Sequence, residues 1–138
     1  MSDIHAEKIN YLYSTDNTGK PVARYGISDF PVSTKFILQS LLFDFEINKT
    51  YEILIYIKNC NDVTLVKSKN NYRLNKNALD DISFTNAEHT RASTVITINT
   101  PIVNIVGEDI YQFTISVNNQ NGTLLDSQKT YAIIQKDS

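Results

Sequence analysis

Apolar and polar residues alternate along most of the chain, which is the pattern of β-strands with one buried face. The clearest case is residues 51–58, where Tyr51, Ile53, Ile55 and Ile57 share one face and polar residues occupy much of the other. Similar patterns predict further strands at 7–14, 22–30, 36–45, 63–67, 92–100, 102–106, 111–117 and 123–135. We therefore expect an all-β protein of about seven to nine strands.

Two of these segments have patterns that matter for packing. In 7–14, the alternation places Ile9, Tyr11 and Tyr13 on one apolar face. Segment 36–45 is apolar on both alternating sets, which fits either a strand buried on both faces or a buried helical turn. Of these two we predict the strand.

Glycine, proline and asparagine mark the connections between the predicted strands. Pro31 should end the second strand, and Gly26 within it suggests a bulge or a point of close approach. The turn before Gly122 is the strongest turn signal, because an Asn-Gly pair accepts two consecutive positive φ values. Residues 68–90 are expected to be an irregular loop, and loops are the default place for function.

The number and spacing of the strands predict one fold. Turns recur every ten to fifteen residues, as in sandwiches and barrels, and 138 residues suffice for one hydrophobic core but not for two. We expect a single antiparallel β-sandwich domain over residues 1–138, with the irregular loop at about 68–90.

The C-terminal third resembles the closing hairpin of immunoglobulin-like β-sandwiches. Gly107 precedes the strand at Tyr111, and Gly122 lies in the turn to the last strand. In such folds a tyrosine near the start of the penultimate strand anchors the corner through its hydroxyl, which implies this role for Tyr111. The N-terminal half is similar to a group of bacterial immunoglobulin-like proteins of unknown function, through Asn17-Thr-Gly-Lys, Gly26-Ile, Pro31, Phe36-Ile-Leu and the strand at 51–58. The resemblance implies a fold, and it brings no catalytic residue.

Composition and charge narrow the classes of partner. Thirteen basic and fifteen acidic side chains give a net charge of -2, so no excess positive field attracts nucleic acid. The N-terminal sequence lacks the pattern of a signal peptide, and no stretch is apolar enough for a membrane span. Cys60 is the single cysteine and has no disulfide partner, which favours a reducing compartment. We expect a cytoplasmic protein that binds neither nucleic acid nor a membrane.

Few residues have the spacing of a catalytic or metal site. His5 and His89 are the two histidines, and neither belongs to a zinc-binding motif. Carboxylates in predicted loops could hold calcium through oxygen ligands, although no calcium-loop motif occurs. The possible ligand loops contain Asp16, Asp80, Asp81, Glu108 and Asp109. Solvated turn residues explain the same pattern, and we expect no cofactor and no metal.

Tyrosine is the residue type that most suggests recognition, since the chain has eight and their rings give rigid contact area with a polar tip. Tyr56 lies on the second face of the strand at 51–58, between Leu54 and Lys58. This stripe would suit a protein partner or self-association if it is exposed. A loop that covers the stripe is the alternative.

The sequence therefore predicts a class of function more than a specific one. A complete pattern of strands without a catalytic constellation favours a non-catalytic module that binds a protein or takes part in an assembly. The alternative is a carbohydrate-binding sandwich that uses tyrosines and loop carboxylates, with or without calcium. An enzyme with its site in the loop at 68–90, including Glu88 and His89, is the weakest of the three hypotheses.

Overall fold

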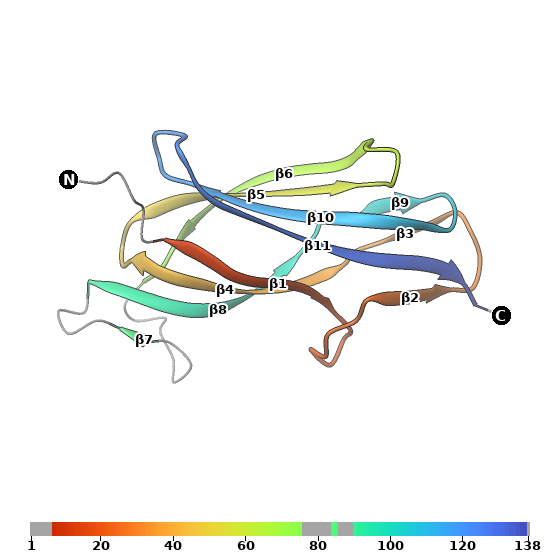
Figure 1. Cartoon of the computed structure of the whole chain (residues 1–138), viewed down its shortest axis with the longest axis horizontal. Helices are drawn as coiled ribbons and strands as arrows, with labels where there is room; N and C mark the ends of the chain where they lie inside the picture. The colour runs from red at the N-terminus through yellow and green to blue at the C-terminus, as the bar shows by residue number, and fades with distance from the viewer. Residues whose placement is uncertain (1–6, 76–83, 86–89, 138) are drawn as a thin grey trace.

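Eleven strands form the part of the chain that the structure, a computed structural model, describes: residues 7–75, 84–85 and 90–137 (Figure 1). They are β1 (Lys8–Thr15), β2 (Arg24–Ile27), β3 (Val32–Thr34), β4 (Ile37–Glu46), β5 (Thr50–Lys58), β6 (Thr64–Arg73), β7 (Phe84–Thr85), β8 (Arg91–Asn99), β9 (Val103–Ile105), β10 (Asp109–Asn118) and β11 (Leu124–Lys136). None of the described residues belongs to a helix, so these ranges contain no helix that could cross a membrane.

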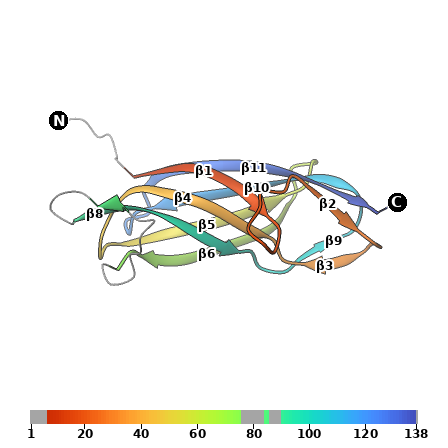
Figure 2. The ribbon, with the colours of Figure 1, turned by 90° about the horizontal axis from the view of Figure 1, so that it is seen from below.

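The strands form two sheets that pack face to face (Figures 1 and 2). One has the order β1-β4-β8-β7 and the other β2-β11-β10-β5-β6, while β3 and β9 pair separately at one end. In immunoglobulin-like folds, strands A, B, E and D form one sheet and C, F and G the other. Strands A, B, E and D correspond in order to β1, β4, β8 and β7. Strands C, F and G correspond to β5, β10 and β11. The all-β sandwich is thus confirmed.

The differences in strand number come from short elements. Seven strands of the described chain have eight or more residues, which agrees with the expected range. The rest have two to four residues each. One of these, β2, pairs in parallel with β11, whereas all other pairs of strands are antiparallel. The chain therefore changes sheet between β1 and β2.

The core lies between the facing sheets, and β5 contributes as its alternation predicts. Tyr51, Ile53, Ile55 and Ile57 are all buried. Phe113 of β10 is fully buried, and its ring packs edge-on against Phe36 with centroids 5.1 Å apart. Such edge-to-face pairs add to the stabilisation that comes from burial alone.

A β-bulge changes which face of β1 is buried. Pairing with β4 shifts between Ile9 and Leu12, so that Ile9, Leu12 and Ser14 point inward. The prediction that Tyr11 shares the buried face of Ile9 is wrong, as it is for Tyr13. The two tyrosine rings instead stack on the other face, with centroids 5.4 Å apart.

A second bulge makes β4 buried on one face. Its pairing with β8 shifts between Leu42 and Phe45, and Asp44 has a positive φ of 59° there. Leu42 and Phe45 therefore both point inward, while Phe43 is 43% exposed. The expectation of burial on both faces is wrong, because two residues of the bulge occupy one step of the alternation.

A serine of the neighbouring strand forms a hydrogen bond with each bulge. The Ser40 hydroxyl donates to the main-chain oxygen of Tyr11 at 2.6 Å, and the main-chain N–H of Asp44 donates to Ser93 Oγ at 2.9 Å. Buried main-chain groups without a partner are costly, so these serines supply hydrogen bonds that the interrupted ladders do not.

Replacement of Ser40 by alanine should lower the free energy of unfolding by about 1–2 kcal/mol, because the Tyr11 carbonyl loses its donor in a buried place. Ser40 is 0% exposed. Urea denaturation measures the change, and the exposed Ser127→Ala is the control, with an expected change below about 0.5 kcal/mol. Equal effects of the two variants would contradict the role assigned to Ser40.

The second strand and the irregular segment are shorter than predicted. Only Arg24–Ile27 forms β2, and a cis peptide bond links Phe30 to Pro31 before β3. A Cβ atom on Gly26 would lie 1.8 Å from Asp137 Oδ1, so this glycine is a point of close approach. Because β6 continues to Arg73, residues 68–73 are strand and not part of an irregular loop.

Three connections share one turn geometry. Asp16, Asn59 and Asn119 each accept main-chain N–H bonds from the second and fourth residues after them. The third residue after each has positive φ: Gly19, Asp62 and Gly122. The expected pair of positive φ values before β11 is wrong, since only Gly122 has one. The side-chain acceptor, rather than a second left-handed residue, holds this turn.

Candidate functional site

The turn between β5 and β6 positions a group of exposed apolar side chains. Asn59 fixes the turn through its side-chain oxygen, which accepts the N–H groups of Asn61 and Val63 at 3.0 Å each. Val63 is 52% exposed at this turn. The turn lies at the end of the sandwich where β10 begins, because Lys58 pairs with Gln112.

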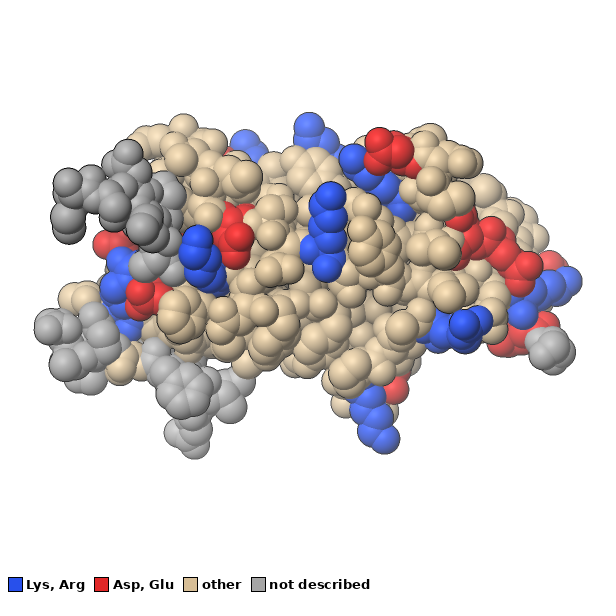
Figure 3. Space-filling model, viewed as in Figure 1, with Lys and Arg blue, Asp and Glu red and all other residues tan. Residues whose placement is uncertain are grey.

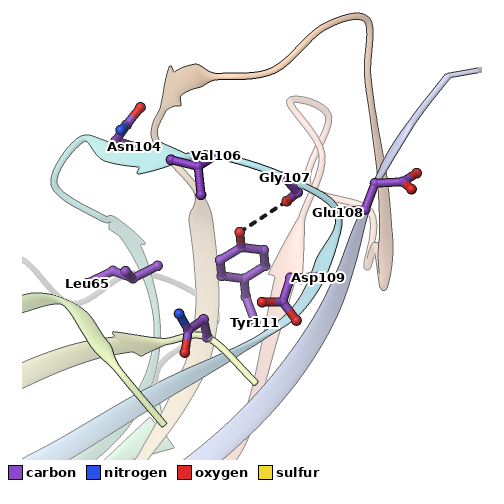
Figure 4. Close-up of a pocket in the computed structure, with 8 residues that line it drawn as sticks. Leu65, Asn104, Val106, Gly107, Glu108, Asp109 and Tyr111 are labelled. Carbon is purple, nitrogen blue, oxygen red and sulfur yellow. Dashed lines mark hydrogen bonds between the residues drawn. The ribbon is translucent and has the colours of Figure 1, made fainter. Parts of the chain in front are cut away.

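An open pocket lies on one side of this turn (Figure 4). It has a volume of about 330 Å³, and Leu65 and Val106 border it together with the ring of Tyr111. Leu65 is 37% and Val106 is 72% exposed. Apolar side chains from β6 and from the connection between β9 and β10 thus meet here.

A second hollow lies on the other side of the turn. Ile110 and Tyr131 line it with Asn59 and Asp62. Ile110 is 49% and Tyr131 is 55% exposed. We call the five exposed side chains on both sides of the turn the apolar end: Val63, Leu65, Val106, Ile110 and Tyr131.

Tyr111 holds the backbone that presents part of the apolar end. Its hydroxyl donates a hydrogen bond to the Gly107 carbonyl at 3.3 Å, drawn as a dashed line in Figure 4. Burial, and to a lesser extent the nearby Asp109 carboxylate, raises the pKa of Tyr111, so the hydroxyl remains a donor. This bond spans the corner between Val106 and Ile110.

Carboxylates surround the apolar end. Glu108 Oε2 accepts the N–H of Lys136 at 2.7 Å, and Asp109 Oδ1 accepts the N–H of Ile110 at 2.7 Å. Asp62 projects from the turn with 84% of its side chain exposed and pairs with Lys58. A hydrogen bond to Asp109, followed by desolvation, raises the pKa of the exposed Cys60 thiol. The rim of this surface is therefore acidic.

The structure does not bring the other predicted ligand loops to this place. Asp16 lies between β1 and β2, where hydrogen bonds from Thr18 and Lys20 lower its pKa. Asp80 and Asp81 fall outside the described residues. Within the described ranges, no three His, Cys, Asp or Glu side chains are placed to hold a metal ion.

Leu54, Tyr56 and Lys58 lie on the outer face of the five-stranded sheet, where each is partly buried. The strand register joins Tyr56 to Thr114 of β10 and to Lys67 of β6, and it joins Thr114 to Lys129 of β11. A row of Lys129, Thr114, Tyr56 and Lys67 therefore crosses four strands. The sequence indicated Tyr56 of this row, but the lysines of β6 and β11 could be placed beside it only by the register.

A polar cluster at the opposite end of the sandwich gave no signal in the sequence. Arg91 forms ion pairs with Glu7 at 3.5 Å, Asp44 at 3.2 Å and Glu46 at 3.8 Å. The Tyr51 hydroxyl donates to Glu7 Oε2 at 2.9 Å and accepts the N–H of Glu46 at 2.8 Å. Burial is the main cause that raises the pKa of Tyr51. Because both hydroxyl bonds tie neighbouring segments together, this cluster has the geometry of a structural anchor.

Comparison with known proteins identifies a fold and no family. No protein-family model matches the chain, and no curated protein is significantly similar to it in sequence. A β-glucuronidase of Bacteroides uniformis contains a similar region, with a TM-score of 0.64 and 14% identity over 94% of this chain and 14% of that one. The chain thus spans a small part of that enzyme.

Two further solved structures have the same fold. A Mobiluncus mulieris adhesin with disulfide, isopeptide and ester cross-links matches at a TM-score of 0.63 and 9% identity, over 95% of this chain and 58% of that one. The C-terminal domain of wzt matches at 0.57 and 12%, over 96% and 75%. At these identities the likeness is one of fold, and it shows that this chain has the architecture of a β-sandwich.

Proposed function

We propose that this chain is a non-catalytic module that works by binding another protein through the apolar end. The observation that carries the proposal is the gathering of five exposed apolar side chains around one turn. Single exposed apolar residues are ordinary, whereas contiguous groups with a polar rim are typical of protein contact surfaces. Val106 is 72% and Ile110 is 49% exposed, so a partner that covers these side chains would bury a large apolar area.

The carboxylates around the apolar end favour a partner of particular chemistry. Asp62, Glu108 and Asp109 lie at its rim and have the same charge. A partner with an apolar centre and basic surroundings would be complementary to this surface. Complementary charge raises the rate of association and excludes wrong partners more than it adds to affinity. The complex should therefore form faster at low salt.

A non-catalytic role is supported by the state of the reactive groups at this end. The thiolate is the nucleophilic form of cysteine, and the raised pKa of Cys60 keeps its thiol protonated. Glu108 and Asp109 each bind a main-chain N–H, which is a structural use of a carboxylate. This fold also occurs as one part of a longer chain, as the region within the β-glucuronidase and the C-terminal domain of wzt illustrate.

Replacement of Ile110 by glutamate should strongly reduce capture of the partner from an extract of the cells that make this protein. A carboxylate buried in an apolar contact costs more than the ~1.4 kcal/mol that corresponds to one factor of ten in affinity, so capture should fall about tenfold or more. Quantitative mass spectrometry of proteins retained by immobilised wild-type and variant chains measures the ratio.

Leu124→Glu provides the matched control. Leu124 is 56% exposed, but it follows the turn between β10 and β11 at the other end of β10. This variant makes the same change of charge as Ile110→Glu and also removes an exposed apolar side chain, but it should retain the partner. Equal capture by wild type, Ile110→Glu and Leu124→Glu would place the contact elsewhere and refute the role of the apolar end.

A further inference from the structure

A groove crosses the outer face of the five-stranded sheet, next to the hollow that Ile110 and Tyr131 line, with which it shares Gln112. It has a volume of about 290 Å³. Clefts that bind a whole small molecule begin at ~300 Å³, so the volume of the groove suits one or two units of an oligomeric ligand. We call it the lysine groove, and it is lined by Tyr56, Lys58, Thr64, Lys67, Gln112, Thr114 and Lys129.

The lysine groove is positively charged. Three ammonium groups line it and no carboxylate does. Lys58 pairs with Asp62, whose side chain is 84% exposed and lies on the turn. Among the residues that the structure describes, Lys67 and Lys129 form no ion pair, and both are exposed. Figure 3 shows basic side chains along the upper part of the molecule, over this sheet. Two ammonium groups are thus available to an anionic ligand.

The floor of the lysine groove offers other contacts. The Tyr56 side chain is partly buried, and Lys67 Nζ lies 5.9 Å from the centroid of its ring. Gln112 Nε2 donates to Thr114 Oγ1 at 3.3 Å, and this amide and hydroxyl occupy the strand next to Tyr56. An aromatic face attracts C–H groups through its quadrupole, while amides and hydroxyls exchange hydrogen bonds with ligand hydroxyls.

The position of the lysine groove favours a saccharide over a peptide. A bound peptide gains most of its affinity from main-chain hydrogen bonds at a free sheet edge. The edge strand β6 carries Lys67, but Tyr56 and Thr114 at the centre of the groove lie on β5 and β10, whose main-chain groups are already paired on both sides. A sugar needs no main-chain partner, because its C–H face can lie on Tyr56 and its hydroxyls can reach Gln112 and Thr114.

We infer that the lysine groove binds an acidic saccharide, with a carboxylate or sulfate group held by Lys67 and Lys129 and a sugar ring on Tyr56. Lysine is a compact point charge, so it accepts either anion without the planar geometry that arginine requires. This is a second binding activity, and it does not depend on the protein partner of the apolar end.

Isothermal titration calorimetry of the whole chain tests this inference. The probes are an oligogalacturonate, a sulfated chondroitin oligosaccharide, a neutral galactose oligomer and poly-glutamate. At least one acidic saccharide should bind about tenfold more tightly than the neutral one, and which of the two binds better identifies the anion. Failure of both acidic saccharides to bind overturns the inference. Poly-glutamate binding as tight as theirs does so too, because the groove would then be a site for acidic protein.

Charge-reversal variants locate the binding. The double variant Lys67→Glu, Lys129→Glu should lose about tenfold or more in affinity, since each exposed ion pair contributes up to ~1 kcal/mol. Lys20→Glu together with Lys136→Glu changes net charge equally, away from the lysine groove, and should bind as wild type does. An equal loss of affinity in both double variants would show that net charge alone causes the loss, and it would contradict binding in the lysine groove. Circular dichroism confirms that each variant is folded.

Discussion

Replacement of Arg91 by methionine should lower the free energy of unfolding by about 3 kcal/mol, because it leaves a buried carboxylate without its cation. Glu7 has a side chain that is only 7% exposed, and Arg91 lies 3.5 Å from it. Burying an unpaired charge is far more costly than burying a pair. Methionine keeps an unbranched apolar stem in place of the aliphatic part of arginine, so the loss reports on charge more than on packing.

The neighbours of Arg91 determine the size of this loss. Asp44 and Glu46 are 34% and 41% exposed, so water compensates for much of what they lose. Glu7 keeps the hydrogen bond from Tyr51 at 2.9 Å, but it gains no positive charge. Glu7 should therefore carry most of the effect of the Arg91 variant.

Denaturation by urea measures the change, with Arg73→Met as the control. Arg73 is exposed and contacts Thr50 at 2.9 Å, so this variant should change stability by less than about 0.5 kcal/mol. Glu7→Gln in the Arg91→Met background should recover part of the loss, because it removes the buried charge. A loss no larger than that of Arg73→Met would contradict the anchoring role of Arg91.

Replacement of Phe113 by alanine should lower the free energy of unfolding by about 3–5 kcal/mol, the usual cost of removing a buried aromatic ring. Phe113 is 0% exposed at the centre of the core, and its edge contact with Phe36 is lost as well. Phe36 in turn packs against Tyr25, with centroids 5.3 Å apart. The cavity would thus reach the contact between the sheet core and β2.

Phe43→Ala is the matched control for the core variant. Phe43 is 43% exposed on the outer face of the β4 bulge, so its removal should cost less than about 1 kcal/mol. Comparable losses for Phe43 and Phe113 would contradict the exposed position of Phe43 and the buried position of Phe113.

The sequence predicted those parts of the fold in which pattern alone determines the buried face. In β5 the alternation from Tyr51 to Ile57 is uninterrupted, and those residues are buried. In β1 and β4 the bulges interrupt it, and Ser40 and Ser93, which stabilise the bulges, look like ordinary polar residues of a half-exposed strand. A bulge shifts every side chain beyond it, so the bulge in β1 changed the face of Tyr11 and the bulge in β4 changed the face of Phe45.

The candidate surfaces depend on contacts between distant segments. Leu54, Tyr56 and Lys58 are close in sequence and were recognised together. Lys67 and Lys129 join Tyr56 only through the pairing of β6 and β11 with the sheet. The apolar end likewise unites Val63 with residues more than forty positions further on, and nothing in the sequence fixes that proximity.

Multi-angle light scattering on material captured from the cells that make this protein is the most direct test of a binding module. The account predicts that the wild-type chain elutes with a second chain, or a second copy, at a fixed stoichiometry. The Ile110→Glu variant should elute at the monomer mass of 15.7 kDa. A wild-type chain that elutes alone at that mass, as a strict monomer, would contradict the account.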